Sequence, residues 1–294
     1  AATVTVTNRA TLLTALVNAK SGDSIRLAPG TYPGKYDITT VATTDKPLWV
    51  CGPRTAVFDY GNYSDGYNIK ISNAANVVLA GMTVRNAQKG ITVIGSSFIT
   101  VADTRVEHIG EEAVHLKFTT TDSTVVGNSI GDTGLMTPTY GEGVYIGTSE
   151  QNWCVYTNCI PDASNRNSVV LNTISNTTAE NIEAKAGTEN GLIAKNTLDA
   201  TGMAPDQSDS NIGVMGNGWV IAKNTMANAP TDAIQVWEIS TGYGKNNTAY
   251  ANTNTTTIPG YTVRLPFNDL NDIAGCDNST TGAALGLSNK TCQS

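Results

Sequence analysis

Charged residues are sparse in this sequence, but several that could transfer protons or bind a cation lie in short, similar segments. They make up 15% of the 294 residues, whereas about 25% is usual for a soluble protein. Lys185 follows Glu180 and Glu183, and two earlier segments carry His115 and Tyr145. Lysine, histidine and tyrosine side chains can exchange protons with a substrate, and neighbouring carboxylates can bind a cation. These residue types favour acid–base chemistry if the fold brings them together.

A repeated pattern, in which one outward residue separates two inward apolar residues, would bring them together. The segments are Ile69-Lys70-Ile71, Ile91-Thr92-Val93, Val114-His115-Leu116, Val144-Tyr145-Ile146, Ile182-Glu183-Ala184, Ile212-Gly213-Val214, Ile234-Gln235-Val236 and Tyr261-Thr262-Val263. Their first positions differ by 22, 23, 30, 38, 30, 22 and 27 residues. The shortest spacing fits one coil of a three-sided β-solenoid, and the longer ones leave room for inserted loops. We therefore predict an all-β solenoid.

A second repeat places an asparagine at a bend after each β-rich stretch. Its members are Asn128, Asn172, Asn196, Asn224 and Asn252. Asparagine tolerates the left-handed backbone conformation of a tight corner, and stacked amides can hydrogen-bond along the solenoid axis. The repeat predicts a column of asparagine side chains, one from each coil.

The two ends of the chain depart from the repeat. Helical spacing of leucines over residues 11–19 predicts a helix that caps the first coil, followed by a strand over residues 24–27. We place the solenoid and its cap in residues 1–268, and a C-terminal tail in residues 269–294. The cysteine spacing predicts disulfides Cys154–Cys159 and Cys276–Cys292, and it leaves Cys51 as a buried thiol.

Stacking of the coils predicts columns of outward side chains on one face, because equivalent residues lie about 4.8 Å apart along the axis. One column contains His115, Tyr145, Glu183 and Gln235, the next contains Lys117, Lys185, Trp237 and Arg264, and a third contains Glu142 and Glu180. The mixture of charged and aromatic side chains is typical of a ligand groove rather than of a solvated wall. The two longest insertions, including the Cys154–Cys159 loop, would form its walls.

Two stretches resemble known proteins. The segment from Ser21 to Tyr32 resembles the opening coil of right-handed parallel β-helices of the pectate-lyase-like superfamily. The stretch from Glu180 to Asn190, with Asn196-Thr197, resembles the alginate lyase and chondroitinase B family of polysaccharide lyases. That resemblance implies that Lys185 is the Brønsted base and that Glu180 is a calcium ligand.

The acid of the reaction cannot be transferred from this family. Met215 stands where the family has a basic residue that acts as the acid. Either the role passes to Tyr145, His115 or Lys117, or the elimination chemistry is absent. Glu142 is a further candidate calcium ligand, and Glu183 could also contribute, since calcium takes several oxygens.

These residues lead us to expect a lyase that cleaves a uronate-containing polysaccharide by β-elimination. Lys117 and Arg264 are candidates to bind sugar carboxylates, Trp237 to stack on a sugar ring, and Glu183 and Gln235 to contact the substrate. Two alternatives remain open. One is a glycoside hydrolase that uses paired carboxylates such as Glu142 and Glu180, and the other is a carbohydrate-binding β-helix without catalytic activity.

Composition limits which classes of partner the protein can bind and indicates where it is located. The net charge of −7 and the pI near 4.8 argue against a nucleic-acid partner, and no apolar run is long enough for a membrane span. The opening Ala1-Ala2-Thr3 is typical of a processed secreted protein. Six N-x-S/T sequons, at Asn62, Asn176, Asn246, Asn254, Asn278 and Asn289, favour a glycoprotein. We expect a secreted, extracellular monomer.

Overall fold

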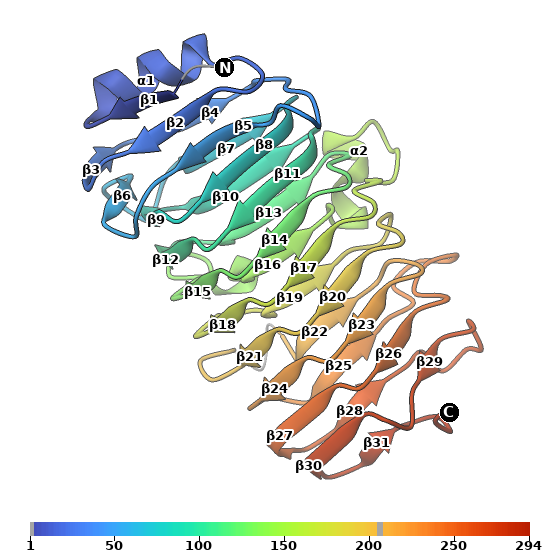
Figure 1. Ribbon diagram of the computed structural model, residues 1–294. Helices are drawn as coiled ribbons and strands as arrows, with labels where there is room; N and C mark the ends of the chain where they lie inside the picture. Colours follow the sequence, from blue (N-terminus) through green and yellow to red (C-terminus); the bar gives the residue numbers. More distant parts are fainter. Residues whose placement is uncertain (1–2, 205–207) are drawn as a thin grey trace.

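A computed structural model describes residues 3–204 and 208–294, so Ala1 and Ala2 lie outside the described residues. The chain winds into a three-sided β-solenoid (Figure 1), in which successive coils contribute parallel strands to three sheets, called here sheets I, II and III. The predicted fold class, an all-β right-handed parallel β-helix with an N-terminal capping helix, is confirmed.

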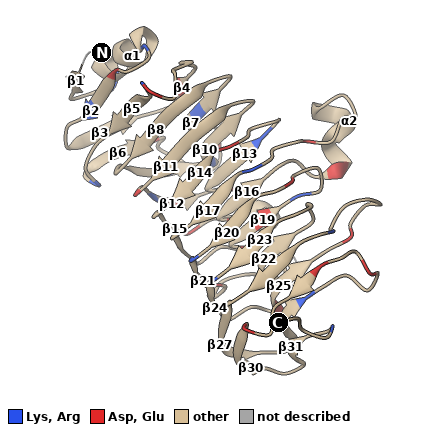
Figure 2. Ribbon diagram, turned by 45° about the vertical axis from the view of Figure 1, so that its right-hand side comes forward, with Lys and Arg blue, Asp and Glu red and all other residues tan. Residues whose placement is uncertain are grey.

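Sheet I runs along one side of the solenoid. Its strands are β1 (Thr3–Val6), β2 (Ser24–Leu27), β5 (Leu48–Cys51), β8 (Ala75–Ala80), β11 (Ser97–Ala102), β14 (Thr124–Val126), β17 (Ser168–Val170), β20 (Leu192–Ala194), β23 (Val220–Ala222), β26 (Thr248–Tyr250) and β29 (Ile273–Ala274). In Figure 2 the strands β11, β14, β17, β20 and β23 are tan, because they carry no charged residue. This side of the solenoid therefore offers few groups for acid–base chemistry.

Sheet II follows sheet I in each coil. Its strands are β3 (Gly30–Pro33), β6 (Ala56–Asp59), β9 (Thr83–Ala87), β12 (Arg105–Ile109), β15 (Ser129–Gly131), β18 (Thr173–Ser175), β21 (Thr197–Asp199), β24 (Thr225–Ala227), β27 (Thr253–Ile258) and β30 (Ser279–Ala283).

Sheet III carries the candidate functional residues. Its strands are β4 (Tyr36–Ile38), β7 (Tyr67–Ser72), β10 (Lys89–Ile94), β13 (Val114–Lys117), β16 (Val144–Ile146), β19 (Ile182–Ala184), β22 (Ser210–Val214), β25 (Asp232–Val236), β28 (Tyr261–Arg264) and β31 (Gly286–Ser288). The register pairs His115 with Tyr145 and Tyr145 with Glu183, as the sequence pattern predicts.

One register is wrong in the sequence-based alignment. The pattern pairs Gln235 with Thr262, but the structure pairs Gln235 with Arg264 and Ile234 with Val263. Thr262 is buried. Arg264 therefore lies in the column of Tyr145 and Glu183, not in the column of Lys185. A coil that the pattern missed, with Asp37 paired to Lys70, precedes the first predicted segment.

Helices are few and lie at the first coil and in the loops. The helix α1 (Arg9–Asn18) begins after Asn8, whose side chain accepts a hydrogen bond from the backbone N–H of Thr11, a stabilising N-cap. It packs Leu12 and Leu16 onto the first coil. The loop between β16 and β17 contains a 3₁₀ turn, Glu150–Asn152, and the short helix α2 (Trp153–Tyr156). Another 3₁₀ turn, Pro138–Tyr140, follows β15.

The predicted asparagine column is present at the corner between sheets I and II. From Asn172 to Asn278, each Oδ1 accepts hydrogen bonds from the backbone N–H and the Nδ2 of the asparagine one coil earlier, and the Oδ1 of Asn128 accepts from the backbone N–H of Thr104. The left-handed conformation belongs to the preceding residue, such as Leu171, Lys195 or Lys223. The expectation that the asparagine itself adopts this conformation is wrong. Two residues form this corner in every coil from β8–β9 to β26–β27.

The cysteines and the C-terminal tail differ in part from expectation. Both predicted disulfides are present. Cys51 is only half-buried, because its side chain lies on the outer face of β5 while Val50 points into the core. The tail is not separate from the solenoid, since β29, β30 and β31 each extend one of the three sheets beyond residue 268.

The structure also bears on the predicted glycosylation sites and on membrane insertion. The sequon residues Asn254 and Asn278 are buried, and Asn278 belongs to the asparagine column, so neither side chain is accessible to a glycan in the folded protein. Asn62, Asn176 and Asn246 are exposed. Among the described residues, no helix has the length and apolar character needed to span a membrane.

Candidate active site

A groove follows the outer face of sheet III and consists of three adjoining hollows. The central hollow has a volume of about 480 Å³, and its lining includes Glu142, Tyr145, Glu180, Glu183, Lys185, Met215 and Trp237. A second hollow of about 450 Å³, the Lys117 hollow, shares Tyr140, Glu142, Tyr145, Ser149 and Asn152 with it. A third of about 200 Å³, the Arg264 hollow, shares Trp237 with the central one. Together they span several coils, as a polymeric ligand requires.

Lys185 and Tyr145 face each other in the central hollow. The Lys185 Nζ lies 5.5 Å from the centre of the Tyr145 ring and 2.8 Å from Oε1 of Glu183. Tyr145 stands on β16, next to β19, and Lys185 follows the end of β19. The sequence predicts Lys185 as the base and leaves Tyr145, His115 and Lys117 as candidate acids, and the structure brings Tyr145 next to Lys185.

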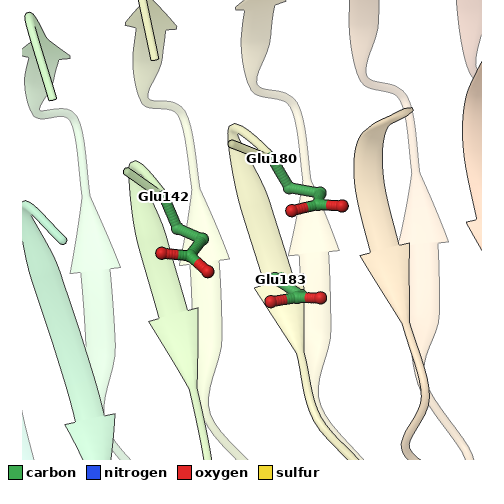
Figure 3. A group of neighbouring side chains, drawn as sticks. All are labelled: Glu142, Glu180 and Glu183. Atoms are coloured by element: carbon green, nitrogen blue, oxygen red, sulfur yellow. The ribbon is translucent and has the colours of Figure 1, made fainter. Parts of the chain in front are cut away.

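Three carboxylates lie beside this pair. Figure 3 shows Glu142, Glu180 and Glu183 projecting from two neighbouring coils toward the same side of the sheet. One carboxylate oxygen from each lies within 4.8 Å of the others. Glu142 and Glu183 are only 5% and 3% exposed. Charges this close in a buried place repel one another strongly.

The crowding raises the proton affinity of Glu142 and Glu180. Burial and the charge of Glu183 raise the pKa of Glu180 to about 8. Burial and the charges of Glu183, Glu112 and Glu180 raise the pKa of Glu142 well above its usual value. Without a further cation, Glu180 therefore holds a proton near neutral pH, and Glu142 keeps its proton to a higher pH than an ordinary carboxyl does.

The same carboxylates act on the base and acid candidates. Burial opposes the charged form of Lys185, but Glu183, Glu142 and Glu180 outweigh it and raise the pKa of Lys185. Burial and the charge of Glu183 raise the pKa of Tyr145 well above its usual value. Tyr145 is thus a neutral phenol that can donate a proton, while Lys185 can accept one only when the negative charge around it is offset.

The carboxylate cluster suits a divalent cation such as calcium. Carboxylate oxygens are the donors that calcium takes in proteins. Among the described residues, Glu142 Oε2 is buried without a hydrogen-bond partner, so it is free to bind an ion. Glu180 and Glu142, the two residues assigned to calcium from the sequence, do lie together, and Glu183 completes the set.

His115 lines the Lys117 hollow and is held by contacts within the protein. Its Nε2 lies 2.9 Å from the carbonyl oxygen of Gly147, and its Nδ1 lies 3.3 Å from Oε1 of Glu112. Its ring packs edge-to-face against Tyr145, with the centres 4.5 Å apart. Burial lowers the pKa of His115. This geometry favours a role in positioning Tyr145 over proton donation to a substrate.

Lys117 lies two coils from Lys185 in the neighbouring hollow. Its Nζ is 5.0 Å from the centre of the Phe118 ring, and it forms no ion pair with a residue in the described ranges. Burial and the charge of Lys89 lower the pKa of Lys117. Lys89 itself is paired with Glu111 and Glu112. Lys117, a candidate acid from the sequence, thus lies two coils from the candidate base Lys185, and its ammonium is open to an anionic ligand.

The substrate-binding candidates at the other end lie along the groove but are engaged with one another. Arg264 stacks over Trp237 at 5.6 Å and lies 3.6 Å from Oδ2 of Asp232. Gln235 Nε2 donates to the same Asp232 oxygen at 2.6 Å, while its Oε1 is buried without a partner among the described residues. Trp237 is exposed and joins the central and Arg264 hollows.

Sequence reasoning missed several residues of the groove. Tyr140 and Asn152 line both larger hollows, but they come from the inserted loops, where no repeat indicates which side chains point inward. Asp209 also lines the central hollow, just before β22. Asp232 was not missed, because the sequence pattern places it in the column of Glu142 and Glu180.

Comparisons with known proteins agree with this geometry. The chain matches an alginate lyase from Paenibacillus sp. str. FPU-7 with a TM-score of 0.92 and 26% identity over 99% of both chains. It matches pectate lyase Pel9A with a TM-score of 0.70 and 14% identity, covering 95% of this chain and 72% of that one.

A lacto-N-biosidase of family GH136 from Eubacterium ramulus has a TM-score of 0.61 and 7% identity, over 99% of this chain and 68% of that one. A scan of family models and a search of curated proteins gave no match. The fold is thus the pectate-lyase-like β-helix, and the alginate lyase match supports a lyase-type function. At their low identities, the other two matches establish the fold alone.

Proposed function

We propose that this protein is an extracellular polysaccharide lyase that cleaves a uronate-containing polysaccharide by β-elimination. The observation that carries the proposal is the approach of Lys185 to Tyr145 in the central hollow, at 5.5 Å from ammonium to ring centre. A base and a neutral proton donor that face one substrate cavity are what an elimination needs. The whole-chain match to an alginate lyase supports the same class.

In this reaction Lys185 removes the proton from the carbon next to the uronate carboxylate. The electron pair of that C–H bond forms a carbon–carbon double bond, and the bond to the glycosidic oxygen breaks. Tyr145 donates its phenolic proton to the leaving oxygen. The products are a sugar chain with an unsaturated end and a chain with a free hydroxyl, and proton exchange with water restores both side chains.

The carboxylate cluster would hold a calcium ion through Glu142, Glu180 and Glu183. When bound, such an ion supplies positive charge opposite the substrate carboxylate, which stabilises the carbanion-like transition state. The charge on the three carboxylates would then no longer hold a proton on Lys185. His115 keeps the Tyr145 ring in place through its edge-to-face contact.

The remaining assignments follow from the substrate. We propose a monomer that binds an acidic polysaccharide along the groove and works outside the cell, where the two disulfides are stable. Glycans would be carried at the exposed sequons, such as Asn62 and Asn246. Gln235, Trp237 and Arg264 would contact the part of the substrate that lies past the central hollow.

A substrate screen tests the proposal. The protein is incubated with alginate, polygalacturonate, chondroitin and hyaluronan, and with neutral glucans and mannans as controls. A lyase produces ultraviolet absorbance from the unsaturated sugar with at least one uronate polymer. New reducing ends without that absorbance would instead identify a hydrolase that uses paired carboxylates such as Glu142 and Glu180. Retention without any product would identify a carbohydrate-binding β-helix.

A further inference from the structure

The Lys117 hollow is continuous with the central hollow, and apart from His115 the side chains that line it alone have no role in the proposed reaction. The two hollows share five lining residues, among them Tyr145 and Asn152. A polymer bound across Lys185 must therefore pass into this second hollow or end before it. The side chains there decide which sugar can follow the one that reacts.

Lys117 is the cation of this hollow that the protein leaves available. The other lysine, Lys89, is bonded to Glu112 and lies 2.6 Å from Glu111. Glu112 also faces His115, and both acids of this hollow lie within ion-pair distance of Lys89. Lys117 has no acid within ion-pair distance in the described part of the chain, and its Nζ lies over the Phe118 ring.

An aromatic surface stands beside this lysine. The rings of Phe118 and Tyr156 lie 6.0 Å apart, tilted by 37°. Tyr156 belongs to the loop closed by Cys154–Cys159 and is 61% exposed. The backbone N–H groups of Phe118 and Thr119 both donate to the buried carboxylate of Asp162, at 2.8 Å, which fixes the strand end that presents the lysine. Sugar rings stack on aromatic faces, and an ammonium binds a carboxylate.

We propose that the Lys117 hollow is a subsite for a second uronate residue of the same chain, whose carboxylate binds the Lys117 ammonium while its ring lies against Phe118 and Tyr156. This inference rests on the proposed function and adds that the sugar bound in the Lys117 hollow must carry a negative charge. An anion at this position also removes the electrostatic penalty that burial and Lys89 impose on the Lys117 ammonium.

The other end of the groove lacks this requirement. The Arg264 guanidinium already faces Asp232 and the rings of Trp237 and Phe267. Its charge is compensated within the protein, and the hollow offers the Trp237 face to a sugar ring. The protein therefore needs a carboxylate on the Lys117 side of the cleaved bond and accepts an uncharged sugar on the Trp237 side.

Titration calorimetry with uronate oligosaccharides tests this subsite without depending on turnover. The probes are saturated tetramers of mannuronate, guluronate and galacturonate, and the same tetramers with their carboxyl groups reduced to alcohols. The proteins are Lys185→Arg, which keeps the ion pair to Glu183 but cannot act as a base, and the double variant that adds Lys117→Met. The matched control adds Lys195→Met instead, which removes one positive charge from the corner between sheets I and II.

We expect Lys117→Met to weaken binding of an acidic tetramer about tenfold, the effect of one charge-assisted contact, and Lys195→Met to leave it unchanged. The reduced tetramers should bind equally to both double variants. Equal loss of affinity for the acidic tetramers in the two double variants would overturn the subsite, as would an unchanged affinity when Lys117→Met is added. The subsite would also be overturned if none of the acidic tetramers binds. If the proposed function is wrong but the subsite is right, the wild-type protein binds these tetramers and forms no unsaturated product from any uronate polymer.

Discussion

The ammonium of Lys185 lies over the ring of Tyr145, 5.5 Å from its centre, although the two residues are forty positions apart in the chain. The parallel register of β16 and β19 alone creates this contact, because it pairs Tyr145 with Glu183 and places Lys185 two residues further on. The proposed chemistry therefore depends on the pairing of two adjacent coils.

Replacement of Lys185 by arginine should abolish turnover and leave the fold intact. The guanidinium keeps the positive charge beside Glu183, but it does not lose its proton in proteins. We expect a fall of about 10³-fold or more in the initial rate of unsaturated product, within the usual range for removal of a proton-transfer group. The melting temperature serves as the control for folding. An arginine variant with more than a tenth of the wild-type rate would rule out Lys185 as the base.

Replacement of Tyr145 by phenylalanine should slow the reaction without weakening substrate binding. The variant keeps the ring that contacts Lys185 and His115 but loses the hydroxyl that protonates the leaving oxygen. We expect kcat to fall about 10²- to 10⁴-fold while KM stays near the wild-type value. A kinetic series over substrate concentration checks this split. A rise in KM at constant kcat would assign Tyr145 to substrate binding instead.

Removal of a bound cation should lower both activity and stability. If Glu142, Glu180 and Glu183 hold calcium, dialysis against a chelator lowers the melting temperature, and calcium at about a hundred times its dissociation constant restores about 2.7 kcal/mol. The variant Glu142→Gln should lose this response, and Asp103→Asn, an exposed carboxylate far from sheet III, should keep it. Calorimetric melts of the wild-type protein and the two variants, with and without calcium, measure the change in stability, and initial rates of the wild-type protein measure the change in activity. Identical melts and rates for the wild-type protein in the two conditions would exclude the cation.

The asparagine column should contribute strongly to stability. The Asn196 Oδ1 accepts from the backbone N–H and the Nδ2 of Asn172, at 2.9 and 3.0 Å, in a buried place. Asn196→Ala leaves these donors unsatisfied, which costs about 2–4 kcal/mol. Thr197→Ala, at the exposed next residue, is the matched control. Urea unfolding measures the difference, and equal midpoints for the two variants would contradict a structural role of the column.

The buried carboxyl of Asp272 should make stability depend on pH. Its Oδ1 accepts from the backbone N–H of Asn247, its Oδ2 has no partner among the described residues, and burial raises the pKa of Asp272 to about 6. The unfolded chain releases this proton near pH ~4, so the folded state loses stability as the pH rises from about 4 to about 6.

Asp272→Asn should remove that loss. We expect the variant to gain on the order of 1 kcal/mol at neutral pH and nothing near the lower end of the range. Thermal melts across this pH range compare it with the wild-type protein. A parallel pH dependence for both proteins would show that another group titrates.

The periodic part of the sequence was sufficient to predict the solenoid, the groove face and the neighbours Tyr145, Glu183 and Lys185. Alternation of inward and outward residues fixes which face a side chain occupies, and the constant rise of the coils fixes its neighbours. The error at Arg264 has the same origin. A shift of two residues keeps every side chain on its face, so alternation alone could not distinguish Thr262 from Arg264 as the partner of Gln235.

The loop residues and the electrostatics could not be predicted in this way. Tyr140, Asn152 and Tyr156 reach the groove from insertions that repeat nothing, so no pattern indicates their direction. The upward shift in the pKa of Lys185 depends on three carboxylates from two coils, and it becomes visible only when their separation is known. The lysine proposed as a base from resemblance therefore needs a compensating positive charge, the role that the calcium ion implied by the same resemblance would fill.

The corner between sheets I and II keeps its two residues in every coil from β8–β9 to β26–β27, whereas the long insertions lie at the other two corners. The scaffold and the groove walls are thus separable modules. Loops such as the one closed by Cys154–Cys159 can diverge in length and composition without disturbing the asparagine column. Selectivity for the polymer can therefore evolve, or be redesigned, by exchange of surface loops on an unchanged frame.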